Sequence, residues 1–368
     1  MIQSLRLNNF KCFADQTIHF APLTVLSGLN GQGKSSVLQA LLLLRQSYQQ
    51  GLLPEKGLAL NGDWVRIGTA NDALYENAGN DTISFGLKLE DRKKVEWNFK
   101  YELDADVLKL VSKPVPLKFF NHSLFDDNFQ YLEAERLGPR VVSERSDHHV
   151  RQHRQLGTRG EYAVDFLDSF RNLKVVDSMK HPESVSSDLF DQTESWIREF
   201  SPRIRIQLYR RVNQISLRYA FEDKIGVSKS YKATNTGFGL TYTLPILIAM
   251  LSASKGSLLL FENPEAHLHP KGQAKLGELM ARAASCGVQI VAETHSDHIF
   301  NGICMAVHSD ILPPEMVKLH FFERKEDNLY SEVISPRMDR KGSIDQWPDG
   351  FFDEWDKALK VLLIPKKD

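Results

Sequence analysis

The stretch that decides the fold is Gly28-Leu29-Asn30-Gly31-Gln32-Gly33-Lys34-Ser35, which has the pattern G-x-x-x-x-G-K-S. Residues 23–27, which precede it, are apolar and partly β-branched and predict a buried strand. Residues 36–45, which follow it, lack Gly and Pro and predict a buried helix. Between a strand and a helix, such glycines let backbone N–H groups surround phosphate oxygens, and the helix N-terminus adds partial positive charge. The stretch therefore predicts a nucleoside-triphosphate site rather than a simple glycine turn.

Two side chains of this loop have distinct expected roles. Lys34 is expected to reach the β- and γ-phosphates, and the Ser35 hydroxyl is expected to hold Mg²⁺. The predicted nucleotide-binding residues of the loop are Asn30, Gly31, Gln32, Gly33, Lys34, Ser35 and Ser36.

The composition is that of an ordinary globular protein, with 42% hydrophobic and 25% charged residues. A chain of 368 residues exceeds what one hydrophobic core usually organises, so two lobes are expected. Its formal net charge of −1 gives no overall affinity for polyanions, although a local basic face stays open.

Cysteine spacing and hydropathy argue against several other classes of protein, namely zinc-binding, disulfide-bonded, secreted and membrane proteins. Cys12, Cys286 and Cys304 are scattered, which argues against a zinc site or a disulfide framework. The chain shows no signal peptide and no apolar run approaching about 18 residues. A cytosolic protein without a membrane partner is therefore expected.

Two patterns of strands are visible along the chain. Alternating apolar runs at 83–101, with a charged turn at 91–94, and at 203–221 predict hairpins of an antiparallel sheet beside the phosphate-binding core. Apolar strands separated by helix-like sequence predict a mostly parallel core sheet. The other expected strands are 2–7, 17–20, 258–261, 288–292 and 317–322, and the expected helices include 160–173, 188–200 and 271–285.

The region between the hairpins is more polar. Its charged stretch 145–154 contains Arg145, Arg151 and Arg154 and is a candidate mobile loop that contacts phosphate. A solvated loop is the simpler interpretation, because most charge runs are exposed surface.

Glu262 ends the apolar strand 258–261, and ligands gather at the carboxyl ends of such strands, so Glu262 is expected to face the phosphate loop and its Mg²⁺. His295 follows the strand 288–292 and is placed to sense a γ-phosphate. His267 and His269 resemble a metal pair, but no third ligand stands at ligand spacing, so we interpret them as conformational loop residues.

A second glycine cluster, 235–245, precedes an apolar helix and contains Gly237, Gly239 and Thr241. Such a helix N-terminus is another anion site. Because it lies far along the chain from the first loop, we expect it to cover the nucleotide of a second subunit.

The order GLNGQGKSS, NTGFGLT, LLLFENPEAHLHP and ETHSD resembles ABC-type ATPases of the SMC/RecF/OLD-like group, often described as AAA-family proteins. By this resemblance, residues 28–35 are Walker A, Gly237 to Thr241 a degenerate signature, Glu262 the Walker B carboxylate, 266–269 the D-loop and His295 the switch histidine. The resemblance implies ATP and Mg²⁺ as cofactors and a head-to-tail homodimer with ATP between Walker A and the partner's signature.

The implied fold is α/β, a P-loop NTPase of the ABC ATPase head type, with a mostly parallel core sheet, an adjoining antiparallel β lobe and a helical insert. The whole chain, 1–368, is expected to form one head. Residues 1–110 and 203–340 would form the core with its antiparallel lobe, 111–202 the insert and 341–368 a C-terminal segment. Residues 343–354 resemble a segment attached to one bacterial subgroup.

The chain departs from the pattern in three ways. No heptad tract is present, so chromosome-spanning mechanics are not expected. The stretch after His295 is too short for the Toprim domain of OLD nucleases, so any nuclease would be a partner. Asn263 stands where the superfamily has its catalytic Glu, and an amide cannot accept a proton as a carboxylate does. Either Glu265 takes over as base or turnover is slow.

These observations predict an ATP-hydrolysing switch that dimerises around ATP, assembles further in some settings, and controls an effector or a nucleic-acid transaction, for example in bacterial antiphage defence. Two alternatives stay open. One is a scaffold that binds ATP without hydrolysing it, and the other is a RecF-like DNA-repair ATPase that uses Arg145, Arg151 and Arg154. An ABC transporter subunit fits less well, because the signature and the FENPE strand differ from that branch.

Overall fold

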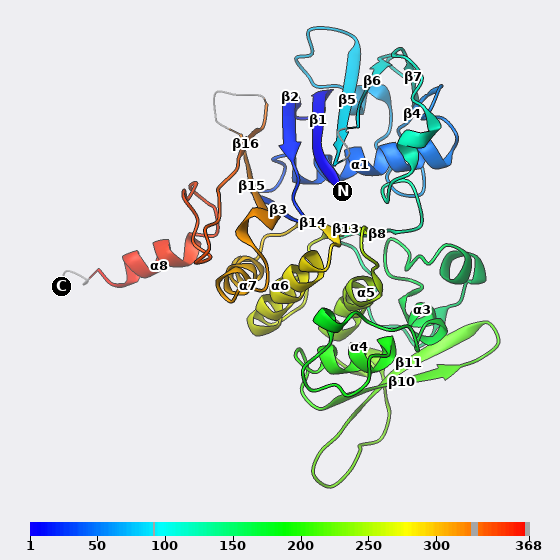
Figure 1. Ribbon diagram of the computed structural model, residues 1–368, viewed down its shortest axis with the longest axis vertical. Helices are drawn as coiled ribbons and strands as arrows, with labels where there is room; N and C mark the ends of the chain where they lie inside the picture. The colour runs from blue at the N-terminus through cyan, green and yellow to red at the C-terminus, as the bar shows by residue number, and fades with distance from the viewer. Residues whose placement is uncertain (91–92, 325–329, 365–368) are drawn as a thin grey trace.

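The computed structural model describes residues 1–90, 93–324 and 330–364, and its chain folds into an elongated body built on three β-sheets (Figure 1). A central sheet lies across the middle, an antiparallel sheet lies above it, and a helical lobe with a small third sheet lies below it (Figure 1). None of the helices within the described residues is long and apolar enough to cross a lipid bilayer.

The central sheet has six strands in the order β16-β15-β3-β14-β13-β8. All neighbours in it pair in parallel except β16, which pairs antiparallel with β15. Its strands are β3 (Leu23–Gly28), β8 (Phe129–Leu132), β13 (Leu258–Glu262), β14 (Gln289–Glu293), β15 (Val317–Glu323) and β16 (Glu332–Ile334). The predicted mostly parallel core sheet is confirmed.

The upper lobe packs a second sheet onto the central one, with helix α1 (Lys34–Gln49) between them. This antiparallel sheet has the order β2-β1-β5-β6-β7-β4. Its strands are β1 (Ile2–Phe10), β2 (Phe13–His19), β4 (Gly57–Ala59), β5 (Thr82–Leu89), β6 (Lys94–Lys100) and β7 (Val107–Leu110), and the short helix α2 (Ala70–Ala73) lies beside it. Residues 91–92 of the predicted turn lie outside the described part of the chain.

Helices cover the opposite face of the central sheet. These are α5 (Phe238–Ser252), α6 (Pro270–Ser285) and α7 (Asp297–His308), followed outward by α3 (Ala163–Ser169) and α4 (Leu189–Ile197). Because side chains alternate along a strand, β13 supplies Leu258 and Leu260 to the core around α1 and Leu259 and Phe261 to the core around α5–α7. The central sheet is therefore buried on both faces, as parallel sheets usually are.

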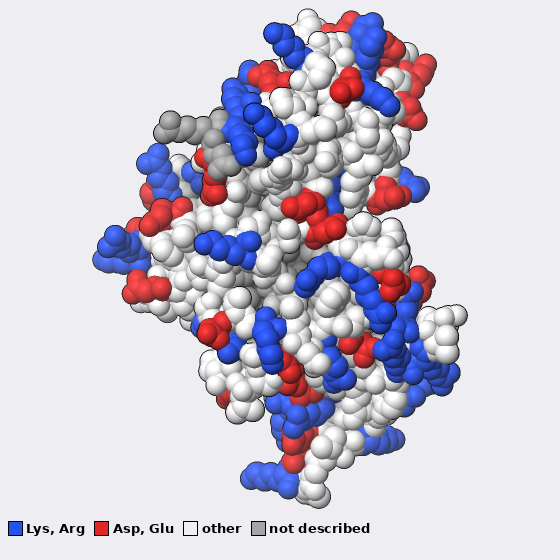
Figure 2. All heavy atoms as spheres, turned by 45° about the vertical axis from the view of Figure 1, so that its right-hand side comes forward, with Lys and Arg blue, Asp and Glu red and all other residues white. Residues whose placement is uncertain are grey.

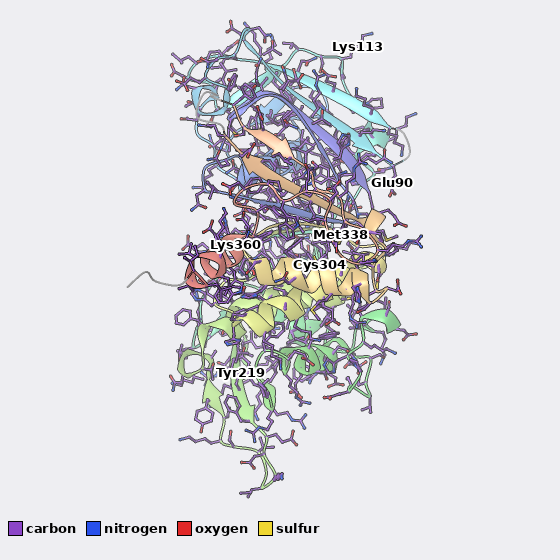
Figure 3. The ribbon with its side chains drawn as sticks, turned by 90° about the vertical axis from the view of Figure 1, so that its left-hand side faces the viewer. Glu90, Lys113, Tyr219, Cys304, Met338 and Lys360 are labelled. Atoms are coloured by element: carbon purple, nitrogen blue, oxygen red, sulfur yellow. The ribbon has the colours of Figure 1, made fainter. Side chains whose placement is uncertain are left out.

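The third sheet, at the outer end of the lower lobe, consists of β9 (Ser143–Glu144), β10 (Ile204–Arg210), β11 (Gln214–Phe221) and β12 (Tyr231–Lys232). The two predicted hairpins therefore belong to different sheets at opposite ends of the molecule. Figure 3 shows this separation, with Lys113 in the upper lobe and Tyr219 in the lower one.

One expectation for residues 111–202 is corrected and another is refined. This range is not wholly an insert, because β8 pairs with β13 as an edge strand of the central sheet. The stretch 145–154 is mostly exposed, as the simpler interpretation has it, but residues Asp147–Gln152 form a π-helical turn and Arg145 pairs with the buried Asp165 at 2.9 Å. Sequence polarity missed both, since β8 is short and the ion pair joins distant residues.

The C-terminal segment leaves β16, passes beside α7 and ends in α8 (Glu354–Leu362), which projects from the body (Figure 1). A Cβ at Gly342 of this segment would lie 2.4 Å from the Cys304 carbonyl oxygen of α7, and Figure 3 shows Met338 in the same region. Phe300 of α7 stacks on Phe352, with ring centroids 5.3 Å apart. Residues 325–329 and 365–368, which fall in the predicted core and C-terminal segment, lie outside the described residues.

Candidate ATP site

The phosphate loop connects β3 to α1 with the backbone that its glycines permit. Gly28, Gly31 and Gly33 have φ angles of 134°, 74° and 101°, in the region that favours glycine. A Cβ at Gly33 would lie 2.5 Å from the Cys12 sulfur, so this position also lacks space for a side chain. Helix α1 begins at Lys34 without a side-chain cap, which leaves its first N–H groups available to an anion.

Lys34 and Ser35 lie at the start of α1 and contact groups of the loop and of β14. The Lys34 ammonium donates to the carbonyls of Gly28 (2.9 Å) and Leu29 (2.8 Å). Burial lowers the pKa of Lys34, and the nearby Glu293 opposes this shift. The Ser35 hydroxyl donates to Glu293 Oε1 at 3.0 Å. The predicted loop residues Asn30, Gly31, Gln32, Gly33 and Ser36 flank these two side chains in the loop and the first helical turn.

Glu262 ends β13 and is held by one residue of β8 and one that follows it. Its carboxylate accepts from the Tyr131 hydroxyl (2.9 Å) and from the Ala134 N–H (3.3 Å). Burial raises the pKa of Glu262, and these two hydrogen bonds oppose the shift. The predicted carboxylate is therefore at the expected edge of the sheet, but its hydrogen bonds lead towards β8 rather than towards Ser35.

Arg136 holds the main chain of the same turn. Its guanidinium donates to the carbonyls of Glu262 (2.8 Å), Asn263 (2.7 Å), Glu133 (2.9 Å) and Tyr242 (3.2 Å). The side chain is only 1% exposed, and burial lowers its pKa to about 10, so it stays charged at neutral pH. Because Tyr242 belongs to α5, Arg136 joins the end of β13 to the signature helix.

The turn after β13 brings Glu265 to His295, the predicted switch histidine. Asn263 has a φ of 43°, which asparagine tolerates better than most residues, and its N–H donates to the Glu293 carbonyl at 2.9 Å. Glu265 Oε1 accepts from the His295 N–H at 2.9 Å. Burial, followed by the charge of Lys34, lowers the pKa of His295. Glu265 and His295, predicted from separate motifs, therefore meet.

Unpartnered polar atoms gather at this place. Among the described residues, Gln32 Oε1, Asn263 Oδ1, Glu265 Oε2 and Glu293 Oε2 are buried without a hydrogen-bond partner. Buried polar groups normally have partners, so their clustering at a glycine-rich helix N-terminus fits a polar ligand. No three His, Cys, Asp or Glu side chains of the described chain form a metal cluster. The donor set fits Mg²⁺ brought by a triphosphate, whose oxygens and waters supply the other ligands.

The predicted signature residues lie in the lower lobe, against the predicted D-loop. Gly237 caps α5, and Gly239 packs so closely that a Cβ there would lie 2.5 Å from the His267 carbonyl oxygen. The His267 ring lies 4.5 Å from that of Tyr242, and His269 caps α6 by accepting from the Lys271 N–H. Thr241 follows in the first turn of α5. The structure thus joins the signature to the D-loop, whereas Lys34 and Ser35 belong to the upper lobe (Figure 1).

The sequence analysis missed three residues of this site. Glu293 stood inside the quoted ETHSD motif, and its position as the last residue of a strand was the available signal. Tyr131 and Arg136 gave no comparable signal, because β8 has four residues and lies far along the chain from β13.

A P-loop ATPase head of the ABC type is the class that this fold and this set of residues define. The chain belongs to the family described as "AAA domain, putative AbiEii toxin, Type IV TA system", whose model matches residues 23–301. A second family model, for a protein of unknown function termed DUF3696, matches residues 312–362.

Known proteins resemble the chain in sequence or in fold. Over 98 residues it is 30% identical to the DNA replication and repair protein RecF of Nostoc punctiforme, and the match covers 26% of each protein. The structure resembles an SMC head bound to the C-terminal winged-helix domain of ScpA, with a TM-score of 0.52, 14% identity, and 91% and 98% of the two chains covered. A Pyrococcus furiosus SMC head bound to the C-terminal domain of ScpA gives the same TM-score and identity, with 98% of each chain covered. At this identity the likeness shows the fold alone.

Proposed function

We propose that the protein is a Mg·ATP-dependent switch, in which the 28–35 loop binds the triphosphate. The observation that carries this proposal is the arrangement of Lys34, Ser35 and Glu293 at the uncapped start of α1, beside buried polar atoms that lack partners. On binding, Lys34 exchanges the carbonyls of Gly28 and Leu29 for phosphate oxygens, and the N–H groups of the loop contact the same phosphates. Mg²⁺, when bound, neutralises phosphate charge and is held by Ser35.

A second copy completes the site in this proposal. Residues 237–241, the predicted signature, form the N-terminus of α5, which has no side-chain cap. Phe238 within them is 56% exposed. An exposed helix N-terminus in the lower lobe is suited to cover the γ-phosphate held by the upper lobe of another copy. ATP would then act as the contact that closes a head-to-tail homodimer, from which a higher oligomer can be built.

Hydrolysis would reopen the dimer. Asn263 cannot accept the proton of the attacking water, and a general base is typically worth about 10²–10⁴-fold in rate. Glu265 has one oxygen on the His295 N–H and one without a partner among the described residues, so it is the available base near the switch histidine. A site in which Glu265 fails as a base would instead belong to an ATP-clamped scaffold.

Phosphate release with Mg·ATP, with molecular mass recorded in parallel, tests the proposal. We expect turnover and ATP-dependent dimerisation in the wild type, loss of both in Lys34→Ala, and loss of turnover alone in Glu265→Gln. Asn263→Ala should retain turnover. If the wild type releases no more phosphate than Lys34→Ala but still dimerises with ATP, the scaffold alternative is correct.

The closed dimer would act on a separate effector. The matching family's description names a putative toxin of a type IV toxin–antitoxin system, and an SMC head of similar fold is bound to a domain of ScpA. We infer from these relatives that ATP-dependent closure presents a docking surface to an effector, for which a nuclease is one candidate, in bacterial antiphage defence. Pull-down from cells with wild type and Lys34→Ala should give an effector that only the wild type retains.

A basic sheet face favours nucleic acid as a second partner. The segment 203–232 contains Arg203, Arg205, Arg210, Arg211, Arg218, Lys224, Lys229 and Lys232 against Glu222 and Asp223. Of these, Arg205 pairs with Glu194 and Glu222, and Arg210 pairs with Asp168. The Arg218 guanidinium lies 5.2 Å from the centre of the Tyr209 ring, which is 49% exposed, so base stacking and phosphate contacts are both available. In Figure 2, blue side chains outnumber red ones at the lower right of the molecule.

This face replaces the stretch 145–154 as the candidate nucleic-acid surface. Arg145 is engaged with Asp165, and Arg151 pairs with Asp147 at 3.3 Å. We expect the joint change of Arg211 and Arg218 to Gln to reduce the slope of log affinity against log salt by about two in DNA-binding titrations. Arg151→Gln is the control and should leave the slope as it is. An unchanged slope in the double variant would exclude this surface.

A further inference from the structure

We infer that Glu293 is the carboxylate that works with Ser35 to hold Mg²⁺, a role that the sequence motif gives to Glu262. This inference rests on the proposed Mg·ATP site and names the acidic residue that orients its metal ligand. Glu293 is the last residue of β14 and is 7% exposed. Glu293 differs from Glu262 in the position of its strand in the sheet and in the hydrogen bonds of its carboxylate oxygens, and these differences support the assignment.

The first difference is the order of the strands. In the central sheet, β14 pairs directly with β3, the strand that leads into the phosphate loop, whereas β13 pairs with the far side of β14. Glu293 stands opposite Leu26 of β3, and Glu262 stands opposite Glu293. Both side chains project towards α1, because Val291 and Leu260, two residues earlier on each strand, pack in the core around α1. Glu293 is therefore one strand closer to Ser35.

The second difference is in the hydrogen bonds. Both carboxylate oxygens of Glu262 are already engaged, one by the Tyr131 hydroxyl and one by the Ala134 N–H. Glu293 accepts from Ser35 with Oε1, while its Oε2 has no partner among the described residues. A buried carboxylate oxygen without a donor is costly, so a ligand that supplies one stabilises the site.

The third point is what the Ser35 contact does. A hydroxyl has one hydrogen to donate and two lone pairs to offer. Since Ser35 donates its hydrogen to Glu293, its lone pairs stay available to a metal ion. Glu293 thus fixes the orientation of the Ser35 oxygen, as carboxylates commonly do for metal ligands. Its own Oε2 is free to accept from a water molecule around the metal.

Charge supports the same assignment. Glu293 lies in the electrostatic field of Glu262 and Glu265, and Lys34 is the cation that opposes this repulsion. When ATP binds, Lys34 would contact the phosphates, and the negative charge of these three carboxylates would lose its compensating cation. A divalent cation held at Ser35 would compensate that charge. Nucleotide and metal are thereby expected to bind together.

The test separates metal binding from nucleotide binding. Affinity for a fluorescent ATP analogue is measured by anisotropy in EDTA and then against increasing Mg²⁺, and Mn²⁺ binding is followed by electron paramagnetic resonance. We expect Glu293→Gln, which keeps the volume and can still accept from Ser35, to bind the analogue in EDTA at least as tightly as the wild type does, because it removes a negative charge near the phosphates. Its Mg²⁺ midpoint should rise by about 10–100-fold, the usual cost of losing a carboxylate that orients a ligand. Glu293→Asp should fall between the two.

Two comparison variants decide the outcome. Glu262→Gln should raise the Mg²⁺ midpoint less than Glu293→Gln does, and Glu278→Gln, an ion-paired carboxylate on α6, should not change it. A rise in Glu262→Gln equal to or larger than that in Glu293→Gln overturns the inference and leaves the proposed function standing. A wild type that binds no analogue in either condition overturns both.

Discussion

Arg136 offers the sharpest test of how the two halves of the site are held together. Its side chain donates hydrogen bonds to four carbonyls, two of them at the end of β13 and one on the signature helix α5. The change Arg136→Met keeps an unbranched side chain of similar reach and removes every donor. The four partly buried carbonyls then lose a charged partner.

The expected loss follows from those four bonds. An unsatisfied buried carbonyl costs about 1–3 kcal/mol. Because the backbone can relax and admit water, we take the lower end for each, which gives about 4 kcal/mol in the free energy of unfolding. For a chain whose denaturant slope in urea is about 3 kcal/mol per M, the unfolding midpoint falls by about 1 M or slightly more. Arg136→Lys retains one donor group and should lose less.

Urea unfolding measures the global effect, and hydrogen exchange locates it. The amides of Ala266 and Leu268 donate within the turn that Arg136 holds, and the Asn263 amide at its start donates to the Glu293 carbonyl, so all three should exchange faster in the Met variant. Arg159, whose pairs with Glu133 and Glu135 are partly exposed, is the matched control, and Arg159→Met should cost about 1 kcal/mol or less. A loss below about 1 kcal/mol in Arg136→Met, or faster exchange spread evenly over the chain, would refute the reasoning.

Three further changes have defined outcomes. Asn263→Glu should raise the rate of phosphate release towards the 10²–10⁴-fold that a general base typically provides. The gain should be smaller by the equivalent of about 1 kcal/mol, because the φ of 43° at this position disfavours Glu. Asn263→Gln is the amide control in the same turnover assay. Burial lowers the pKa of His320 from 6.5 to about 4, so the unfolded chain takes up the proton first and the free energy of unfolding falls by up to about 3 kcal/mol as pH drops through this range. His320→Gln should remove that slope in urea titrations at several pH values. Gly239→Ala should lower thermal stability by about 1–3 kcal/mol, because its Cβ would meet the His267 carbonyl oxygen at 2.5 Å, whereas Gly237→Ala, with open space, should not.

The parts of the fold that depend on local pattern could be predicted from the sequence. Strand β3, the glycine loop and α1 follow from residues that are adjacent in the chain, and their order fixes a parallel core. The placement of β8 could not be predicted, because an edge strand of four residues shows no clear periodicity. The separation of the two hairpins into different sheets also depends on tertiary packing that alternation does not encode.

The candidate site divides in the same way. Lys34, Ser35, Glu262, Glu265 and His295 were expected from motifs, and the contact between Glu265 and His295 brings two of these motifs together. The partner of each carboxylate, by contrast, depends on the order of strands in the sheet. Since β14 lies between β3 and β13, a residue that the motif analysis did not use contacts Ser35.

The positions of the carboxylates around the phosphate loop indicate whether the site favours ATP binding or ATP hydrolysis. Glu293 is bonded to Ser35, where it favours holding a metal ion, and an amide stands at Asn263, where a base would activate water. Glu265 would have to accept a proton from water while one of its oxygens accepts a hydrogen bond from the His295 N–H. Under the proposed function, the site would therefore be better equipped to retain Mg·ATP than to hydrolyse it. Slow hydrolysis would lengthen the closed state of the proposed switch, and the chemistry at Asn263 and Glu265 would set the time available for a partner to act.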